Sequence, residues 1–225
     1  MSEKQLLITE DGSHTLYIPE LDETYHSAYG AIQESNYVFI TQGLDYFKRQ
    51  ERAKRIKIFE VGFGTGLNAL LSLIYVKSHH IDISYQSIEA FPVNQRDINM
   101  LNYPDLISDE LALEMFKLIH SSSWEIWNEI SPGFLLKETN DLIQDFKPEE
   151  RFDLCFFDAF APSKQPEIWD KEILEEIYVG LTDRGVFVTY CAKGQLKRDL
   201  KNIGFEIETL SGPPGKMEMV RAIKI

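Results

Sequence analysis

Between residues 55 and 204, apolar runs alternate regularly with segments of helical spacing, and this alternation limits the possible fold more than any other feature of the chain. The runs that we expect to form strands are 55–62, 81–90, 134–139, 152–160 and 185–190. The segments that we expect to form helices are 67–76, 94–101, 109–122, 171–181 and 193–204. Strands and helices that alternate in this way form a parallel sheet with helices on both faces.

Two further predicted strands, 205–210 and 217–225, end the chain. The turn SGPPGK that joins them is short, so the two strands must run antiparallel. We therefore predict an α/β domain at 51–225, with a doubly wound, mostly parallel seven-stranded sheet and a C-terminal antiparallel hairpin. This architecture resembles that of the class I S-adenosylmethionine-dependent methyltransferases, a Rossmann-like fold in which the ligand lies beyond the carboxyl ends of the strands.

The first 50 residues follow a different pattern. Two short apolar runs within 6–18 flank Asp11-Gly12, which predicts a β-hairpin. The segment 25–47 has helical spacing in its second half. We expect residues 1–50 to form an extension that packs on the domain, with the stretch YGAIQESNY (29–37) covering the cofactor.

Composition excludes several classes of protein. No apolar run reaches the length of about 18 residues that a membrane-spanning helix needs. The start, MSEKQLLITEDG, lacks the apolar core of a signal peptide. The two cysteines, Cys155 and Cys191, form neither a disulfide framework nor a metal-binding cluster. We therefore predict a cytoplasmic protein with reduced thiols and no bound metal.

The charge of the chain is unevenly distributed. It carries 36 acidic and 23 basic residues, a net charge of −13, and this balance argues against a polyanionic partner. Residues 184–225, however, hold eight Lys/Arg and four Asp/Glu, which gives +4 there and leaves −17 for the remainder. The chain could therefore present one basic face, although ordinary variation of surface charge explains the same distribution equally well.

A glycine-rich turn, EVGFGTGLN, follows the first predicted strand and precedes the first helix of the alternating part. Glycine lets a backbone turn sharply or approach a ligand closely. The third glycine falls one residue too early for the dinucleotide-binding pattern G-x-G-x-x-G, so the turn resembles the first motif of the methyltransferases instead. A purely structural turn is the alternative. The residues that we expect to hold or position the cofactor here are Glu60, Gly62, Gly64, Thr65, Gly66 and Asn68.

Polar residues close the next two predicted strands as well. Glu89, in SYQSIEAF, can accept hydrogen bonds from the two ribose hydroxyls of the cofactor, although a solvated surface glutamate would look the same in sequence. After the third strand, Asn140 or Asp141 lies where folds of this kind bind the adenine amino group. Asp141 could equally cap the helix that follows.

The fourth predicted strand of this region ends at Asp158, in FDLCFFDAFAPSKQPEIWD (152–170). A carboxylate that ends an apolar strand is costly unless it is used or paired. At the edge of the cofactor site, it could orient a substrate amine and accept its proton as a methyl group is transferred. Phe160, Pro162 and Trp169 would supply a flat apolar wall for a ring. The alternative is an aspartate that caps a helix or satisfies loop amides.

Four strings carry a resemblance to a known family: SAYGAIQESNYVFI (27–40), FEVGFGTGLNAL (59–70), SIEAFP (87–92) and FFDAFAPSKQPEIW (156–169). With the C-terminal GPPGKMEMVRA (212–222), they resemble the tRNA 5-(aminomethyl)uridine methyltransferases over nearly the whole chain. The resemblance implies S-adenosylmethionine as cofactor, a tRNA anticodon stem-loop as partner, and methylation of the aminomethyl group on the wobble uridine. It also implies that Asp158 faces the substrate amine.

The same resemblance includes bifunctional proteins that carry a flavin-dependent oxidase half. Since this chain stops at Ile225, we expect it to perform the methyl step alone, with the free amine supplied by a separate route.

A basic rim beside the crevice could bind the tRNA phosphates. Most of its candidate members lie on the predicted helix 193–204, some of them four residues apart on one face. An ordinary solvated helix face is the alternative. The basic residues that could form this rim are Lys164, Lys193, Lys197, Arg198, Lys201 and Lys216.

Two other functions remain open from the sequence. The first is an N-methyltransferase or aminopropyl-type transferase for a small amine, which the net charge of −13 favours. The second is a non-catalytic module of the same fold that binds RNA or a protein partner. The Asp158 loop argues against this second reading, because a module without chemistry has no need of a carboxylate there.

Overall fold

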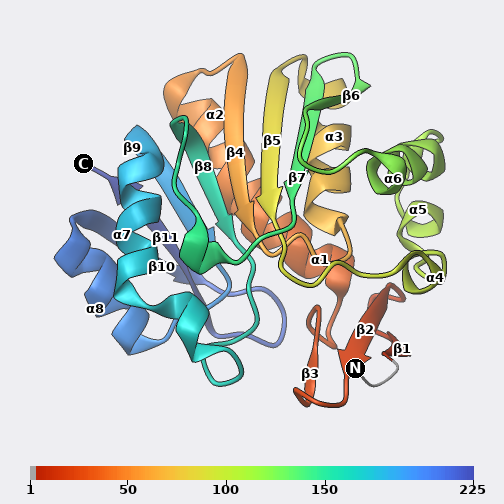
Figure 1. The fold of residues 1–225 in the computed structure, drawn as a ribbon, viewed down its shortest axis with the longest axis horizontal. Coiled ribbons are helices and arrows are strands. Elements are labelled where there is room, and N and C mark those ends of the chain that lie inside the picture. The colour runs from red at the N-terminus through yellow and green to blue at the C-terminus, as the bar shows by residue number, and fades with distance from the viewer. Residues whose placement is uncertain (1–3) are drawn as a thin grey trace.

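An eight-stranded sheet forms the centre of the computed structural model, which describes residues 4–225 (Figure 1). The strand order is β10-β11-β9-β8-β4-β5-β7-β6. The parallel strands at its centre are β4 (Arg55–Val61), β5 (Asp82–Ile88), β7 (Phe134–Thr139), β8 (Phe152–Phe157) and β9 (Leu181–Thr189). The predicted parallel α/β sheet is therefore confirmed.

The predicted C-terminal hairpin is also confirmed. β10 (Phe205–Ser211) and β11 (Glu218–Lys224) pair antiparallel, and β11 inserts between β10 and β9. The sheet has one strand more than the seven expected, because β6 (Asn128–Ser131) pairs antiparallel with β7 at the far edge. This strand is four residues long and buries only Ile130, so it has no apolar run that would reveal it in the sequence.

Helices cover both faces of the sheet. α7 (Lys171–Gly180) and α8 (Gly194–Ile203) lie on one face, while α3 (Leu67–His79) and α6 (Ala112–Ser121) lie on the other (Figure 1). Two hydrophobic clusters result, one on each face. The side chains of β4 show the period-two pattern, since Ile56 and Ile58 enter one cluster and Phe59 and Val61 enter the other.

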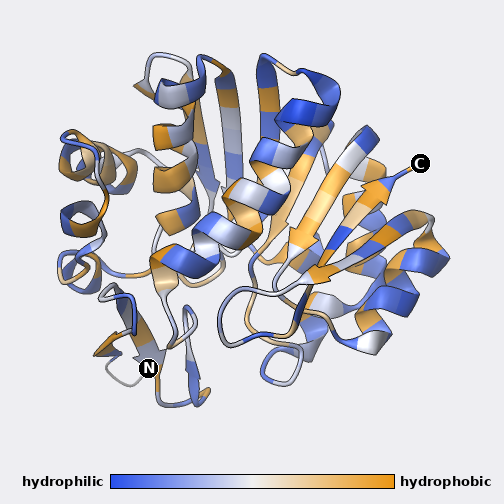
Figure 2. Cartoon of the chain, turned by 180° about the vertical axis from the view of Figure 1, so that it is seen from behind, coloured by the Kyte–Doolittle hydropathy of each residue, from blue (hydrophilic) through white to orange (hydrophobic). Residues whose placement is uncertain are grey.

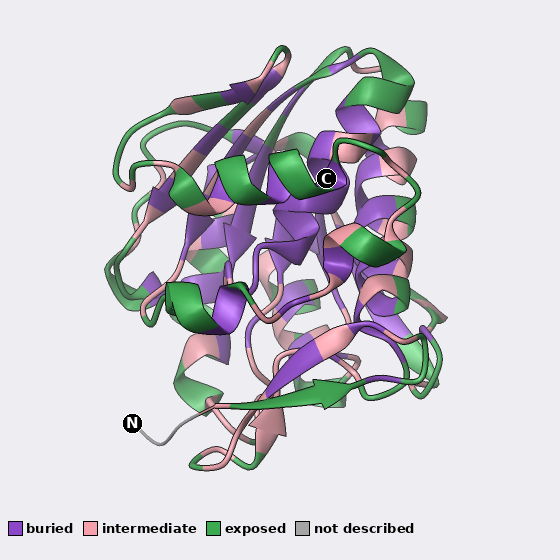
Figure 3. Cartoon of the chain, turned by 90° about the vertical axis from the view of Figure 1, so that its right-hand side faces the viewer, coloured by how far each residue is buried: buried purple, intermediate pink, exposed green. Residues whose placement is uncertain are grey.

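The hydropathy and burial of the chain follow these layers. Figure 2 shows hydrophobic residues along the inner strands and hydrophilic residues on the outward sides of the helices. Figure 3 shows the strands of the sheet as mostly buried. No helix within residues 4–225 is both long and apolar enough to cross a bilayer.

The smaller elements differ more from the sequence-based expectation. The predicted helix 94–101 shortens to α4 (Gln95–Ile98), and α5 (Tyr103–Leu106) was not predicted. In α4, Asn94 caps the first turn by accepting a hydrogen bond from the Asp97 amide. Two short 3-10 helices, η2 (Ile143–Asp145) and η3 (Pro166–Trp169), occupy the loops after β7 and β8.

The predicted N-terminal hairpin is present as β1 (Gln5–Ile8) and β2 (His14–Ile18), and a short strand β3 (Glu23–Thr24) adds to it. Residues 1–3 of the predicted extension lie outside the described residues. Leu16 of β2 joins the same hydrophobic cluster as α3, so the hairpin packs on the main sheet's helical layer.

A continuous helical stretch connects the hairpin to β4. It consists of α1 (Ala31–Ser35), a π-helical segment η1 (Asn36–Asp45) and α2 (Tyr46–Glu51). Helical spacing in the second half of 25–47 predicted a helix there, and the structure confirms it. The Asp11 side chain accepts hydrogen bonds from the amides of Ser13 and Gln33, which fixes the hairpin against the start of α1. Glu34 and the residues before it thereby acquire a fixed position beside the sheet.

Candidate active site

A cavity of about 630 Å³ lies beyond the carboxyl ends of the parallel strands. The loops after β4, β5, β7 and β8 form its floor, as expected for a doubly wound sheet. Most residues of 18–27, with Glu34, Tyr190 and Lys216, contribute further lining from the N-terminal extension, the end of β9 and the β10–β11 turn. Segments that are far apart in the sequence therefore enclose one site.

The glycine turn lies at the centre of this floor. Gly62, Gly64 and Gly66 have φ of 88°, 53° and 71°, a backbone region that favours glycine. A Cβ on Gly62 would lie 2.7 Å from the carbonyl oxygen of Asp158, so glycine also lets the ends of β4 and β8 approach each other. Gly66 begins α3 as its N-cap residue. Gly62 and Gly64 line the cavity, whereas Gly66 faces His120 away from it.

Glu60 and Asn68 hold the turn from beneath. The Asn68 amide donates hydrogen bonds to Glu60 Oε1 at 3.0 Å and to Asp158 Oδ2 at 2.8 Å, and the Ser87 hydroxyl donates to Glu60 Oε2 at 3.0 Å. Burial raises the pKa of Glu60 well above its ordinary value. Neither residue is part of the cavity lining, so the structure places both as supports of the turn and of Asp158.

Thr65 is placed in the same supporting layer. Its side chain is buried and accepts a hydrogen bond from the Tyr103 hydroxyl at 3.2 Å. The His120 ring contacts the Thr65 carbonyl oxygen at 3.2 Å. Thr65 therefore joins the turn to α5 and α6 and does not line the cavity.

Glu89 faces the cavity at the end of β5, where the sequence predicted a ligand for the ribose hydroxyls. Its Oε2 accepts the Gly64 amide hydrogen at 3.0 Å, and its Oε1 accepts that of Phe91 at 2.8 Å. Burial raises the pKa of this carboxyl above its ordinary value, and the two amides partly oppose the rise. Each oxygen keeps a further lone pair, so Glu89 can still accept hydrogen bonds from a ligand.

The two candidates after β7 take different positions. The Asn140 side chain donates to the carbonyl oxygens of Glu89 at 2.8 Å and of Ala90 at 3.2 Å, which ties the loops after β5 and β7 together. Asp141 lines the cavity, and its Oδ1 accepts the Leu142 amide hydrogen at 2.8 Å. The structure thus favours Asp141 over Asn140 as the residue that meets a ligand, and Asp141 is not the N-cap residue of η2.

Asp158 is the first residue after β8 and lines the cavity. The predicted strand 152–160 stops at Phe157, so the carboxylate lies at the start of the loop. Burial raises the pKa of Asp158 to about 7, the negative charge of Glu34 adds to this, and the Asn68 hydrogen bond and the Lys216 charge oppose it. A carboxyl with this pKa can both accept and release a proton near neutral pH.

The predicted apolar wall is only partly assembled. Phe160 lines the cavity, and its ring meets that of Tyr25 edge to face, with centroids 5.2 Å apart. Trp169 is buried beneath the loop, where it packs against Phe157 and donates from Nε1 to the Phe160 carbonyl oxygen at 2.8 Å. Pro162 does not line the cavity. The structure therefore pairs Phe160 with Tyr25, and Trp169 supports the loop from the core.

The predicted basic rim divides into two groups. Lys216 lies inside the cavity lining and pairs with Glu34, while Lys164 pairs with Asp22 at 3.5 Å. On α8, Lys197 donates to Glu218 at 2.6 Å. Lys193 and Arg198 are exposed, and within residues 4–225 neither forms an ion pair. A phosphate-binding surface at α8 would therefore draw first on the exposed Lys193 and Arg198, whereas Lys216, in the β10–β11 turn, faces the cavity.

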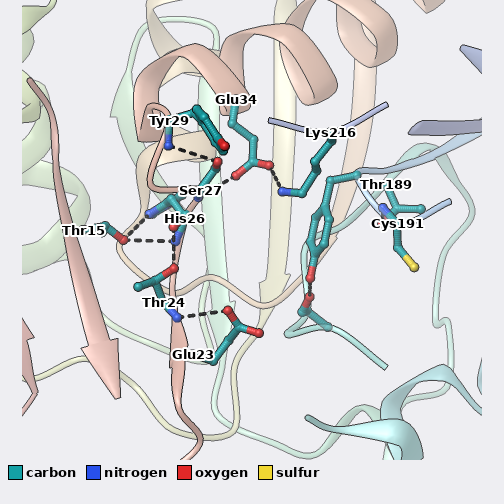
Figure 4. A network of polar contacts seen from close by, with 12 residues as sticks. Thr15, Glu23, Thr24, His26, Ser27, Tyr29, Glu34, Thr189, Cys191 and Lys216 are labelled. Carbon is teal, nitrogen blue, oxygen red and sulfur yellow. Dashed lines mark hydrogen bonds and ion pairs between the residues drawn. The ribbon is translucent and has the colours of Figure 1, made fainter. Parts of the chain in front are cut away.

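Sequence reasoning missed the contribution of residues 18–34 to the lining. Tyr25, His26 and Ser27 line the cavity from the segment between β3 and α1, and Glu34 lines it from α1. Figure 4 shows His26, Ser27 and Glu34 together. The string SAYGAIQESNY pointed to this segment without identifying any role for its side chains. Tyr190, after β9, was also missed, because nothing in its sequence neighbourhood marks it as a site residue.

The residues present fit S-adenosylmethionine. The cavity volume of about 630 Å³ lies in the range typical of small-molecule sites. A Cβ on Gly64 would lie 3.1 Å from the Tyr25 ring, so glycine leaves the space between the turn and that ring open. The carboxylates of Glu89 and Asp141 are present for ribose and adenine groups. Within residues 4–225, no group of three or more His, Cys, Asp or Glu could hold a metal ion.

Comparison with known proteins agrees with this geometry. Residues 127–225 match a family model described as S-adenosyl-L-methionine-dependent methyltransferase. A bifunctional protein MnmC of tRNA 5-methylaminomethyl-2-thiouridine biosynthesis, from Pseudoalteromonas atlantica, is 30% identical over 219 residues, which cover 90% of this chain and 31% of that protein. The protein of the same name from Nitrosospira multiformis is 27% identical over a match that covers 92% of this chain and 35% of that protein. The chain spans about a third of the length of these relatives.

Solved structures of methyltransferases resemble this chain over most of its fold. The structure of MnmC2 from Aquifex aeolicus superposes with a TM-score of 0.81 at 25% identity. The match covers 99% of this chain and 70% of the Aquifex chain. Human methyltransferase-like protein 13, in complex with SAH, shares the fold with a TM-score of 0.51 at 15% identity. That match covers 86% of this chain and 82% of the human chain. In its turn, its cavity and the match of residues 127–225, the chain is similar to the S-adenosyl-L-methionine-dependent methyltransferases, whose fold it shares.

Proposed function

We propose that this protein transfers a methyl group from S-adenosylmethionine to the nitrogen of the 5-aminomethyl group on the wobble uridine of tRNA. The observation that carries the proposal is Asp158, a carboxyl of pKa about 7 in the same cavity as the glycine turn. The names of the relatives, which refer to tRNA 5-methylaminomethyl-2-thiouridine biosynthesis, support the choice of substrate.

The cofactor end of the cavity is formed by the turn and the two strand ends beside it. The Gly62 and Gly64 backbone would contact the cofactor, Glu89 would accept its ribose hydroxyls, and Asp141 would meet the adenine. Bound there, S-adenosylmethionine supplies an electrophilic methyl group on a positively charged sulfur. Glu60 and Asn68 keep these groups in place from outside the cavity.

Asp158 performs the proton chemistry at the other end. An aliphatic amine is mostly protonated at neutral pH and must lose one proton before its lone pair can attack. Asp158 can accept that proton and hold the remaining N–H groups in the direction of attack. In the balanced reaction, a nitrogen–carbon bond forms, the carbon–sulfur bond breaks with its electron pair on sulfur, and a proton leaves the amine. Phe160 and Tyr25 offer apolar faces for the uracil ring.

We place the tRNA over the cavity mouth, in contact with the exposed basic residues of α8. The net charge of −13 requires the phosphates to avoid most of the surface, so binding must be local. Since its substrate would be tRNA, we place the protein in the cytoplasm. The alternative of a small-amine transferase is not favoured by the relatives.

The test uses S-adenosylmethionine labelled in its methyl group. We expect label to enter tRNA from a strain that makes the aminomethyl nucleoside and cannot methylate it. Matched tRNA from a strain that cannot make the amine should take up none. Incorporation into both tRNAs, or into neither, would contradict the proposed function.

A further inference from the structure

An ion pair between Glu34 and Lys216 lies in the same cavity lining as Asp158, and the sequence predicted no contact between these two residues (Figure 4). Glu34, on α1, is only 6% exposed. One of its oxygens, Oε2, accepts the Ser27 amide hydrogen at 2.9 Å, and the other pairs with the Lys216 ammonium group. A buried carboxylate without a cationic partner is costly, so this position of Glu34 requires a cation beside it.

The same ammonium group lies over an aromatic ring. Lys216 Nζ is 4.3 Å from the centre of the Tyr190 ring. The Tyr190 hydroxyl donates to the Ala159 carbonyl oxygen at 2.8 Å, which fixes the ring next to the loop that carries Asp158. A carboxylate on one side and an aromatic face on the other are the two groups by which proteins recognise alkylammonium ions.

Lys216 can leave this position without a change of fold. Its side chain is 29% exposed, so a path to solvent is open. The backbone of its turn is held in place, because a Cβ on Gly215 would overlap the Tyr29 ring and one on Gly212 would lie 2.4 Å from the Lys216 carbonyl oxygen. Only the flexible lysine side chain needs to rotate for its ammonium group to withdraw.

We propose that Glu34 and Tyr190 form an alkylammonium subsite, which Lys216 fills in the free protein and which the substrate's aminomethyl group enters in its place. This inference rests on the proposed function, and it adds the position of the reacting amine. A lysine side chain ends in a CH₂–NH₃⁺ group, and a protonated aminomethyl group ends in the same atoms. Lys216 thus presents to Glu34 and Tyr190 the same group that the substrate would present.

The subsite also explains how a cationic substrate meets a proton acceptor. The amine arrives protonated, and Glu34 binds that form. Asp158 lines the same cavity and then accepts one proton, which leaves a neutral amine beside Glu34. Displaced into solvent, Lys216 no longer adds a positive charge near the reacting nitrogen. Ground-state binding by Glu34 and proton removal by Asp158 are therefore separate tasks.

The test replaces Lys216→Ala and supplies ethylammonium as a probe of the vacated subsite. We expect ethylammonium chloride to raise the melting temperature of this variant more than the same concentration of sodium chloride does. The matched control, Lys117→Ala, removes an exposed lysine outside the cavity lining and should show no such response. The Glu34→Gln/Lys216→Ala double variant should lose the response.

Kinetics then show whether the substrate amine uses the subsite. Ethylammonium should inhibit tRNA methylation by Lys216→Ala competitively with tRNA, at a concentration about tenfold lower than for the wild type. Glu34→Gln, which keeps Lys216 in place, should raise KM for tRNA by about tenfold with a smaller change in kcat.

Each outcome has a separate meaning. Stabilisation by ethylammonium without competition would overturn the inference, because the subsite would then bind only the lysine. No stabilisation of Lys216→Ala would overturn it as well. If the wild-type protein methylates no tRNA, the proposed function fails, and the melting temperatures still decide whether the alkylammonium subsite exists.

Discussion

The two ends of the cavity are built in different ways. The end that we assign to the cofactor is lined by Val61, Gly62 and Gly64 of one continuous turn, together with single side chains at the ends of two neighbouring strands. The reacting end combines Asp158 with residues from the N-terminal extension, the end of β9 and the β10–β11 turn. The first is a local structure that the sheet topology positions, whereas the second exists only after distant parts of the chain have packed together.

This difference teaches which part of a site a local motif can encode. A glycine turn has the same backbone geometry wherever a strand and a helix flank it. Glu34 and Lys216, which are 182 positions apart, come into contact only in the folded chain. We therefore expect variants at the two ends to separate binding from turnover.

The largest effect should come from Asp158→Asn. The change keeps the shape and the hydrogen bond to Asn68, and it removes the proton acceptor. We expect kcat to fall by about two to four orders of magnitude, the usual range for general acid–base catalysis. Cofactor affinity, measured by calorimetry, should stay within about twofold, since Asp158 would act on the amine. A variant with near-normal turnover would reduce Asp158 to a structural role and remove the contrast between the ends.

Gly64→Val should produce the opposite pattern. A β-branched residue at φ 53° is strained, and its Cβ would lie 3.1 Å from the Tyr25 ring. Strain of this kind costs about 1–3 kcal/mol, so we expect S-adenosylmethionine affinity to fall by about 10- to 100-fold. Gly12→Val is a matched control, because Gly12 also has positive φ and its Cβ would meet open space away from the cavity. Unchanged affinity in Gly64→Val would show that the cofactor lies elsewhere.

The pH dependence tests the reacting end alone. Activity should rise as Asp158 loses its proton, so kcat/KM should increase through pH values near the pKa of about 7. Glu34→Gln removes a negative charge and should move this rise to lower pH by about one unit. The charged groups that act with Asp158 are Glu34, Glu60 and Lys216. A rise that does not move in Glu34→Gln would separate Glu34 from Asp158.

The protonation of Asp158 should also affect stability, which should fall with rising pH where activity rises. The folded-state pKa of Asp158, about 7, exceeds its ordinary 3.8, so the folded protein holds this proton more tightly than the unfolded chain. The free energy of unfolding should therefore fall as pH rises through that interval. Asp158→Asn removes this contribution and should be more stabilising at high pH than at low pH, as measured by urea denaturation.

The smallest effect should come from α8. Reversing Lys193 and Arg198 to Glu should raise KM for tRNA and flatten its salt dependence by about 1.4 in slope, at about 0.7 for each lost phosphate contact. Reversing Lys48 and Lys117, which lie on α2 and α6, supplies a control of equal charge. Equal salt slopes in the two double variants would exclude α8 from the tRNA-binding surface.

Most of the fold could be predicted because its signals are local. Each parallel strand is an apolar run, and each long helix shows the expected spacing. β6 was missed because NEIS contains one buried apolar residue, Ile130. The π-helical geometry of 36–45 was also missed, because helical spacing alone does not distinguish a π-helix from an α-helix.

The candidate site was predictable where its residues follow directly from the sheet topology. Glu89 and Asp158 follow apolar strands, so their positions at the cavity follow from topology. The sequence could not distinguish a cavity residue from the support behind it, so Glu60, Thr65 and Trp169 were grouped with residues that line the cavity. Lys216 was assigned to a basic surface, because its charge was visible in the sequence and its partner Glu34 was not.

The central claim concerns the atom that receives the methyl group. The most direct measurement digests tRNA to nucleosides after incubation with the protein and S-adenosylmethionine, and locates the added methyl group by mass spectrometry. We predict conversion of the 5-aminomethyl nucleoside to its methylaminomethyl form, with no other nucleoside changed. A methyl group on a base or ribose atom, or an unchanged aminomethyl nucleoside beside active enzyme, would contradict the account.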